Sequence, residues 1–386
     1  MALKASSRGF IPPFMVMDVM REANQRETLG ERVIHMEVGQ PSTSAPAGVL
    51  NAVQNIMMRD RMGYTDAFGI PRLRQRIAQH YHEQYGVDVS PNNVMVTTGS
   101  SGAFILSFLA SFDVGDRVAL TSPSYPAYRN ILAALGIEVI DIPVDVEINF
   151  QPNVEVLSRA IETAEGKVDG LVIASPSNPT GTMLDPDELS DIVTYCNDQD
   201  IRLISDEIYH GITYERPAQT ARAYGREMIV ISSFSKYFSM TGWRVGWMVV
   251  PSDLLRAVEC LGQNLFISPP TVSQHAAVAS FECRNELDAS VARYAGNRTI
   301  LLDQLPKAGF DQLAPVDGAF YIYADISNIT EDSPEFCNHM LAATGVAATP
   351  GTDFDPSRGQ RFVRFSFSGG ESDIEEAVKR LINWRN

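Results

Sequence analysis

A lysine flanked by two serines, with an arginine eight residues further on, is the strongest chemical signal in this sequence. Lys236 lies in Ser232–Trp247 (SSFSKYFSMTGWRVGW), directly after an apolar run typical of a strand. A lysine where a strand opens into a cleft loses solvation, so its pKa falls and it becomes a nucleophile for carbonyl groups. The hydroxyls of Ser233 and Ser235 with the Arg244 guanidinium suit a phosphate dianion. Taken alone, the stretch also fits a solvated loop lysine beside a helix-capping serine.

Two more predicted strands end in residues suited to an anionic, flat ligand. Thr97–Ala103 (TTGSSGA) joins a strand to an apolar helical pattern, so its backbone N–H groups, with Ser100 and Ser101, can form an anion cradle at a helix N-terminus. In Ser122–Tyr128 (SPSYPAY), Tyr125 follows another strand and can stack on a planar ring. A plain turn and ordinary aromatic packing are the alternatives for each segment by itself.

A further pair of strand ends adds an amide, a carboxylate and a phenol. Asn178 lies in Ser175–Gly181 (SPSNPTG), and Asp206 and Tyr209 lie in Ser205–His210 (SDEIYH). Singly, these fit a turn and solvated loop carboxylates. In open α/β sheets, however, ligands bind outside the carboxyl ends of the strands. Five strand ends carrying complementary groups therefore predict one shared ligand site.

Strands and helices alternate through the middle of the chain. The helical pattern Pro186–Asn197 is the clearest, with Asp185 as its N-cap. Such alternation predicts an α/β domain with a mainly parallel, seven-stranded sheet sandwiched by helices. The expected strands are Val94–Thr97, Arg117–Thr121, Gly136–Asp141, Gly170–Ala174, Ile201–Ser205, Ile229–Ser232 and Arg244–Val250.

The two ends of the chain have a different character. We expect residues 46–275 to form the large domain, and residues 1–45 and 276–386 to meet in a smaller α+β domain. The supporting patterns are a helix over Val16–Leu29 and strands over Val33–Val38, Ala319–Asp325 and Arg361–Ser366. No Gly/Ser-rich linker separates the parts.

Charge and composition exclude several classes of protein. The 386 residues are 45% hydrophobic and 20% charged, as in ordinary globular proteins, and 31 Lys and Arg against 47 Asp and Glu give a net charge of −16. Nucleic acid and anionic membrane surfaces both favour the opposite sign, so neither is an expected partner.

Cysteine spacing and hydropathy indicate a soluble protein in a compartment that keeps thiols reduced. The four cysteines (Cys196, Cys260, Cys283 and Cys337) form no CxxC and lie near no histidine at metal-ligand spacing, so we expect free thiols and no metal site. The start of the sequence lacks a signal-like apolar stretch, and no run approaches the ~20 apolar residues of a transmembrane helix. These features predict a cytoplasmic protein.

At the motifs described above the chain resembles the fold type I aminotransferases that use pyridoxal 5′-phosphate, in the aspartate-aminotransferase-like class I/II group. The resemblance spans nearly the whole chain in the family's motif order. The matching segments are Asn178–Gly181, Asp206–Tyr209, Ser233–Arg244, Gly63-Tyr64 with Gly69–Arg74, and Arg364–Ser368.

The resemblance implies a role for each residue around the cofactor ring. Lys236 would form the Schiff base with the cofactor and act as general base. Asp206 would hold the pyridine nitrogen protonated, and Asn178 and Tyr209 would donate to the ring 3-hydroxyl. Tyr125 would stack on the ring.

It also implies how the phosphate and the substrate are held in a homodimer. The phosphate ligands would be Ser100, Ser101, Ser233, Ser235 and Arg244, with Tyr64 reaching in from a second subunit. Arg364 would bind the α-carboxylate of the amino acid, helped by Asn178 and by the backbone at Gly39.

The substrate class depends on whether a second cation is present. The cradle carries Ser100 and Ser101 where a lysine is one solution for a distal carboxylate, and Leu261–Pro270 contains no Arg or Lys. A hydrophobic pocket is suggested by Phe10–Met15, Met17 and Phe266-Ile267, although core packing explains them equally well. We expect a neutral or aromatic amino donor with 2-oxoglutarate as acceptor. Aspartate aminotransferase is the alternative if Arg129 or a partner subunit supplies the cation.

Other functions use related parts. A C–S β-lyase of the cystathionine type has the same cofactor apparatus, and release of pyruvate and ammonia without an acceptor would identify it. A regulator that senses pyridoxal phosphate would need a basic DNA-binding module, and the net charge of −16 argues against one. A nicotinamide-dependent dehydrogenase is excluded because no GxGxxG with a following acidic residue is present.

Overall fold

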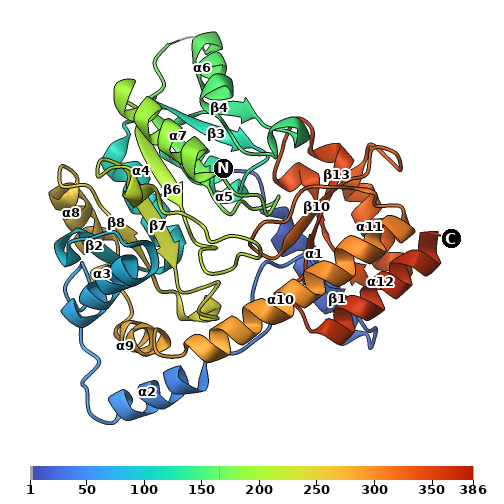
Figure 1. Cartoon of the computed structure of the whole chain (residues 1–386), viewed down its shortest axis with the longest axis horizontal. Helices are drawn as coiled ribbons and strands as arrows, with labels where there is room; N and C mark the ends of the chain where they lie inside the picture. The colour runs from blue at the N-terminus through green and yellow to red at the C-terminus, as the bar shows by residue number, and fades with distance from the viewer. Residues whose placement is uncertain (1–2, 165, 386) are drawn as a thin grey trace.

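A computed structural model of the chain describes residues 3–164 and 166–385, and a seven-stranded sheet lies at its centre (Figure 1). Its order is β2-β8-β7-β6-β5-β3-β4. The pairs among β3 to β7 are parallel, whereas β8 runs antiparallel to both of its neighbours. The strands are β2 (Val94–Thr97), β3 (Arg117–Ser122), β4 (Glu138–Pro143), β5 (Gly170–Ala174), β6 (Arg202–Asp206), β7 (Ile229–Ser233) and β8 (Gly246–Val249). The predicted sheet is confirmed.

Helices cover both faces of this sheet because its central strands are apolar on both sides. In β7, Val230 belongs to one core cluster while Ile229 and Ile231 belong to the other, which is the period-two alternation of a strand. The first cluster includes α3 (Pro71–Tyr85), α6 (Val154–Thr163), α7 (Pro186–Asp198) and α9 (Thr271–Ser280). The second includes α4 (Gly99–Ser111), α5 (Pro126–Leu135) and α8 (Leu255–Leu265).

The two ends of the chain meet beside the large sheet. Strand β1 (Ile34–His35) pairs in parallel with β11 (Val346–Ala347). A four-stranded antiparallel sheet has the order β12-β13-β10-β9. Its strands are β9 (Gln312–Leu313), β10 (Tyr321–Asp325), β12 (Thr349–Pro350) and β13 (Phe362–Ser366). The accompanying helices are α1 (Met15–Thr28), α10 (Arg284–Gln304), α11 (Ser333–Thr344) and α12 (Glu371–Arg385), and α2 (Ala47–Met57) packs against α9.

Three strands begin later than their sequence patterns predict, and two of them are also shorter. Strand β8 begins at Gly246 because Arg244 has φ +50°, a left-handed conformation that no strand contains. Strand β4 begins at Glu138 because Gly136, with φ +82°, ends α5. The strand expected over Val33–Val38 is reduced to the two residues of β1.

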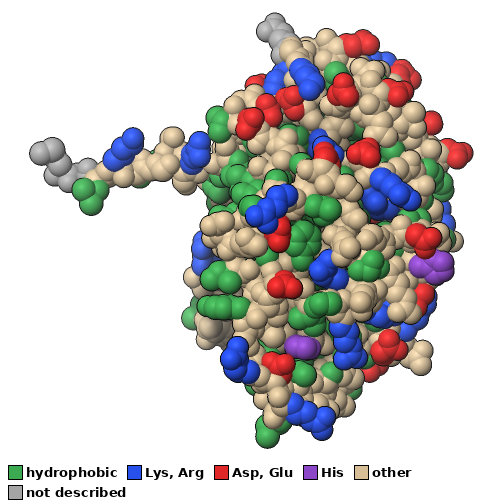
Figure 2. Space-filling view, turned by 90° about the vertical axis from the view of Figure 1, so that its left-hand side faces the viewer, with side chains coloured by type: hydrophobic (Ala, Val, Ile, Leu, Met, Phe, Trp, Pro, Cys, Tyr) green, Lys and Arg blue, Asp and Glu red, His purple; other side chains and the backbone are tan. Residues whose placement is uncertain are grey.

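The described surface carries mixed charge. On the face shown in Figure 2, Lys and Arg side chains are interspersed with Asp and Glu, without a continuous basic stripe. Across residues 3–164 and 166–385, none of the helices has both the length and the apolar character that crossing a bilayer requires. Within the same residues, no group of three or more His, Cys, Asp or Glu is arranged to hold a metal ion.

Candidate active site

A cleft of about 550 Å³ lies between the carboxyl ends of the large sheet's strands and the small sheet. Most of the predicted site residues line it, although they come from segments spread over more than 300 residues. They are Gly39, Ser100, Ser101, Tyr125, Asn178, Asp206, Tyr209, Ser235, Lys236, Arg244 and Arg364. The parallel strands bring their ends to one edge, so their polar residues converge.

Two predicted residues lie elsewhere. Ser233 is buried behind the cleft, where its hydroxyl oxygen lies within hydrogen-bond distance of Ser235 Oγ (2.9 Å) and of the Val245 carbonyl oxygen (3.3 Å). Within this one chain it supports Ser235 from behind and does not line the cleft. Tyr64 is 83% exposed and is not among the lining residues of its own chain's cleft.

Lys236 follows β7 and points across the cleft. Its Nζ donates a hydrogen bond to the Gly39 carbonyl and lies 5.5 Å from the centre of the Tyr209 ring. Burial, together with the positive charge of Arg364, lowers the pKa of Lys236 to about 8. The amine is therefore neutral at mildly alkaline pH, where an ordinary lysine is charged.

Asp206 is the last residue of β6 and is buried. Its carboxylate accepts hydrogen bonds from the Tyr128 hydroxyl and from the Ile208 N–H (3.1 Å). Burial raises the pKa of Asp206 to about 6, while these two hydrogen bonds and Lys236 act in the opposite direction. A cationic group placed against this carboxylate would keep it ionised.

Tyr128 was missed by sequence reasoning, although it contacts the buried acid directly. It lies in α5, three residues after Tyr125, so both rings share one face of the helix with centroids 5.3 Å apart. The Phe104 ring packs at 4.9 Å from the Tyr128 ring. The three-residue spacing of the two tyrosines was the only available signal.

Tyr321 is a second functional contact that the sequence did not reveal. From β10, its hydroxyl hydrogen-bonds the Tyr209 hydroxyl at 2.6 Å. A Cβ atom at position 39 would lie 1.8 Å from the Tyr321 hydroxyl, so Gly39 is required for this packing. The pair places two phenols beside Lys236.

Arg364, in the middle of β13, is only 2% exposed. The Tyr321 and Phe354 rings lie 4.4 and 4.6 Å from its guanidinium carbon. Nη1 donates to Asn178 Oδ1 (2.7 Å), and Nη2 donates to the Glu37 carbonyl. Its buried Nε has no partner among the described residues, so the guanidinium retains capacity for an anionic ligand.

The proposed anion cradle lies at the N-terminus of α4. Gly99, the first residue of α4, has φ +67°, and a Cβ there would lie 2.4 Å from Arg244 Nη2. Only glycine lets the guanidinium lie this close to the helix N-terminus. Ser100, Ser101 and Ser235 add hydroxyls to the same side of the cleft. Helix N–H groups, hydroxyls and one guanidinium together suit a phosphate.

Residues 31–381 match the family described as aminotransferase class I and II. A Mycobacterium tuberculosis protein named valine–pyruvate aminotransferase is 49% identical over 385 residues, covering 99% of this chain and 98% of that protein.

Solved structures agree with the sequence match. The crystal structure of an aminotransferase from Mycobacterium tuberculosis superimposes with a TM-score of 0.96 at 48% identity, covering 99% of each chain. Aspartate aminotransferase from Thermus thermophilus with maleate gives a TM-score of 0.93 at 28% identity, covering 99% of this chain and all of that one.

Members of this family depend on pyridoxal 5′-phosphate, and the cleft fits that group. The Gly99 cradle matches its phosphate, the buried Asp206 carboxylate matches its ring nitrogen, and Lys236 matches its aldehyde. The unpartnered Nε of Arg364 can donate a hydrogen bond to a substrate carboxylate. On sequence, fold and site chemistry alike, the chain belongs to the class I and II aminotransferases and is a pyridoxal-phosphate-dependent enzyme.

Proposed function

We propose that this enzyme transfers the amino group of a neutral, apolar L-amino acid such as valine to a small 2-oxo acid such as pyruvate. The observation that carries the proposal is the apolar part of the cleft lining. It includes Phe14, Val16, Met17 and Met20, which lie at and just before the start of α1. An apolar wall favours a hydrocarbon side chain over a distal carboxylate.

The charges of the cleft support the same substrate class. Its lining cations among the described residues are Lys236, Arg244 and Arg364, and each already has a role in holding the cofactor or the α-carboxylate. Arg129, a candidate for a second carboxylate, pairs with Asp141 outside the cleft. A substrate with two carboxylates would leave one of them unpaired, so pyruvate fits better than the 2-oxoglutarate expected from the sequence.

The apolar residues singled out in the sequence divide into two groups. Phe14 and Met17 line the cleft, whereas Phe10 and Ile267 are exposed and Phe266 packs against the second core cluster. Residues at and just before the start of α1 therefore contribute much of the apolar lining, together with Val38, Ala174 and Ile208. The name of the Mycobacterium tuberculosis relative, at 49% identity, agrees with this donor class.

The residues of this chain divide the chemistry between them. Bound pyridoxal phosphate supplies an electron-accepting ring that makes the Cα–H bond of an attached amino acid acidic. Arg364 binds the α-carboxylate and orients that bond. Lys236 would accept the proton from the substrate Cα and deliver it to the cofactor carbon that carries the aldehyde in the free cofactor, and positioned proton transfer of this kind is typically worth ~10²–10⁴-fold. Asp206 keeps the ring nitrogen protonated, and Tyr209 and Asn178 donate to the ring oxygen.

We also propose that Tyr64 completes the phosphate site of a second subunit. Its side chain is 83% exposed in one chain, so it is accessible to a second subunit. Mixing inactive Lys236→Ala chains with inactive Tyr64→Phe chains tests this. Recovery of activity would support a shared site, and a mixture as inactive as its components would contradict it.

A half-reaction titration tests the donor class. Single amino acids are added to the holoenzyme without acceptor, and loss of the visible cofactor band is recorded. We expect valine to convert the cofactor at lower concentration than aspartate, and pyruvate to restore the band. Preference for aspartate would favour the aspartate aminotransferase alternative. Pyruvate and ammonia formed from cystathionine without acceptor would favour the β-lyase.

A further inference from the structure

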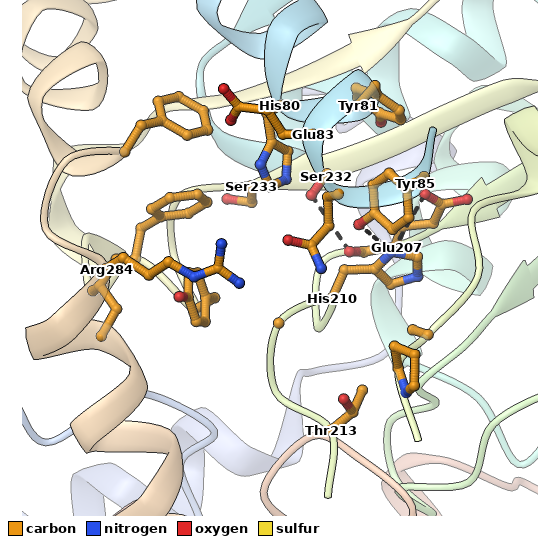
Figure 3. Close-up of a pocket in the computed structure, with 18 of the residues that line it drawn as sticks. His80, Tyr81, Glu83, Tyr85, Glu207, His210, Thr213, Ser232, Ser233 and Arg284 are labelled. Carbon is orange, nitrogen blue, oxygen red and sulfur yellow. Dashed lines mark hydrogen bonds and ion pairs between the residues drawn. The ribbon is translucent and has the colours of Figure 1, made fainter. Parts of the chain in front are cut away.

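A second, smaller cavity of about 180 Å³ lies behind the loop that follows β6, and we call it the rear cavity. Its walls come from the C-terminal half of α3, the start of α10 and residues 207–218 (Figure 3). Asp206 lines the cleft and Glu207 the rear cavity, so one loop separates the two. Figure 3 shows Tyr85, Glu207 and His210 lying together on this side.

The contacts of His210 determine its hydrogen-bonding state. Its Nε2 lies 3.0 Å from the Ser175 carbonyl, which can only accept, so Nε2 carries the proton. Its Nδ1 lies 2.8 Å from the Tyr85 hydroxyl and accepts from it. Burial lowers the pKa of His210 to about 3, so the ring is neutral at physiological pH. A neutral ring with one donor and one acceptor satisfies both contacts.

These two contacts connect three separate parts of the fold. Ser175 opens the loop that carries Asn178, and His210 directly follows Tyr209. Tyr85 is the last residue of α3, which packs against the large sheet. The imidazole thus spans the two loops whose side chains are assigned to the cofactor's ring oxygen, and α3 holds it from behind.

We propose that His210 is a positioning residue that sets the distance between the Asn178 loop and the Asp206–Tyr209 loop, with Tyr85 fixing the orientation of its ring. The proposal rests on the proposed roles of Asn178 and Tyr209. No atom of His210 needs to touch the cofactor. A small misplacement of catalytic groups lowers rates strongly even when binding survives, so the effect belongs in kcat.

The test compares His210→Phe, His210→Gln and Tyr85→Phe in the holoenzyme. Phenylalanine fills the space without either hydrogen bond. Glutamine can donate from its amide to the Ser175 carbonyl and accept from Tyr85. We expect His210→Phe to lower kcat about 10- to 100-fold, as losses of supporting contacts do, with KM changed by less than about 3-fold. It should also shift the pH midpoint of the visible cofactor band, and His210→Gln should restore most of both properties.

His80→Gln is the control for loss of another imidazole, because the half-buried His80 lines the rear cavity and its ring contacts Tyr85, Phe238 and Phe281, but it lies in α3 and joins neither cofactor loop. An unchanged kcat and band midpoint in His210→Phe, or equal losses in the glutamine variant, would overturn the proposal. If His210→Phe does not fold, Tyr85→Phe provides the test. The proposal requires that Tyr85→Phe shifts the pH midpoint of the visible cofactor band and retains the thermal midpoint of the wild type. A wild-type protein without the visible band would overturn the proposed function itself.

Discussion

The cleft and the rear cavity lie on opposite sides of one loop, and they treat buried polar groups differently. On the rear side, Glu207 Oε1 accepts from the Ala221 N–H (2.8 Å) and from Ser205 Oγ (3.2 Å). On the cleft side, Arg364 keeps a buried Nε without a partner among the described residues. Arg364 lines the cleft, so its free donor is available to a ligand there, whereas Glu207 Oε1 is already used within the protein.

Asp206 and Glu207 are neighbouring buried acids, and they differ in the groups that they face. Burial raises the pKa of Asp206 to about 6 and that of Glu207 to about 7. Asp206 has a cofactor nitrogen to meet, which would favour its ionised form. Glu207 faces neutral partners and a neutral histidine, so it stays protonated over part of the physiological range.

Replacing the cleft's lysine should have the largest effect. Lys236→Ala removes both the attachment point and the proton acceptor, so we expect activity to fall by about 10²–10⁴-fold or more, with loss of the band from covalently attached cofactor. Absorbance spectra and steady-state rates measure this. Lys307→Ala, at a surface ion pair with Asp303, is the control. Full transaminase activity in Lys236→Ala would contradict the assignment.

Removing the carboxylate anchor should come next. Arg364→Gln loses a charge-assisted contact worth about 1.5–3 kcal/mol, which corresponds to a rise of about 10- to 100-fold in KM for the amino donor. It also removes a charge that lowers the pKa of Lys236, so that pKa should rise. Arg361→Gln, near the start of the same strand and 50% exposed at its side chain, serves as the control. An equal KM in both variants would place the anchor elsewhere.

Weakening the support of Asp206 should have a moderate effect. Tyr128→Phe removes one hydrogen bond to the ionised carboxylate, so the pKa of Asp206 should rise and kcat should fall about 10-fold. The pH profile of kcat reports this, with the acidic limb displaced to higher pH. Tyr195→Phe, in the partly exposed part of α7, is a control for loss of a phenol. A profile identical to wild type would show that Tyr128 only packs.

Glu207, in the rear cavity, should affect the pH dependence of stability. Because the pKa of Glu207 is 4.5 when unfolded and about 7 when folded, the folded protein binds a proton that the unfolded chain has lost. Wild-type stability therefore falls as pH rises from about 4.5 to 7. Glu207→Gln lacks this loss, so its advantage over wild type should grow across that window to the order of 1–3 kcal/mol.

Thermal midpoints of wild type and Glu207→Gln between pH 4.5 and 8 measure that difference. His210 contributes in the opposite direction, because its lowered pKa makes stability fall as pH drops below 6.5. Subtracting the two curves cancels the histidine contribution. A difference between wild type and Glu207→Gln that stays constant between pH 4.5 and 8 would contradict the raised pKa of Glu207.

Much of the fold could be predicted because its signals are local. The period-two alternation of strands such as β7 and the capping of α7 are set by neighbouring residues. Where the predicted start of a strand was wrong, the backbone conformation of a single residue was the cause. The left-handed conformation of Arg244 moves the start of β8 by two residues, to Gly246. Placement at strand ends also predicted that Lys236, Asp206 and Asn178 would meet.

The sequence by itself determined the family, the cofactor and the strand ends that carry them, because each motif is a short run of residues whose order alone is informative. Only the tertiary structure decided the partners of those residues. The Glu37 carbonyl meets Arg364 across 327 positions, the Tyr321 hydroxyl fills the space beside Gly39, and the His210 ring joins two loops. Such contacts depend on how packed elements bring distant side chains within about 3 Å, and no local pattern encodes that distance.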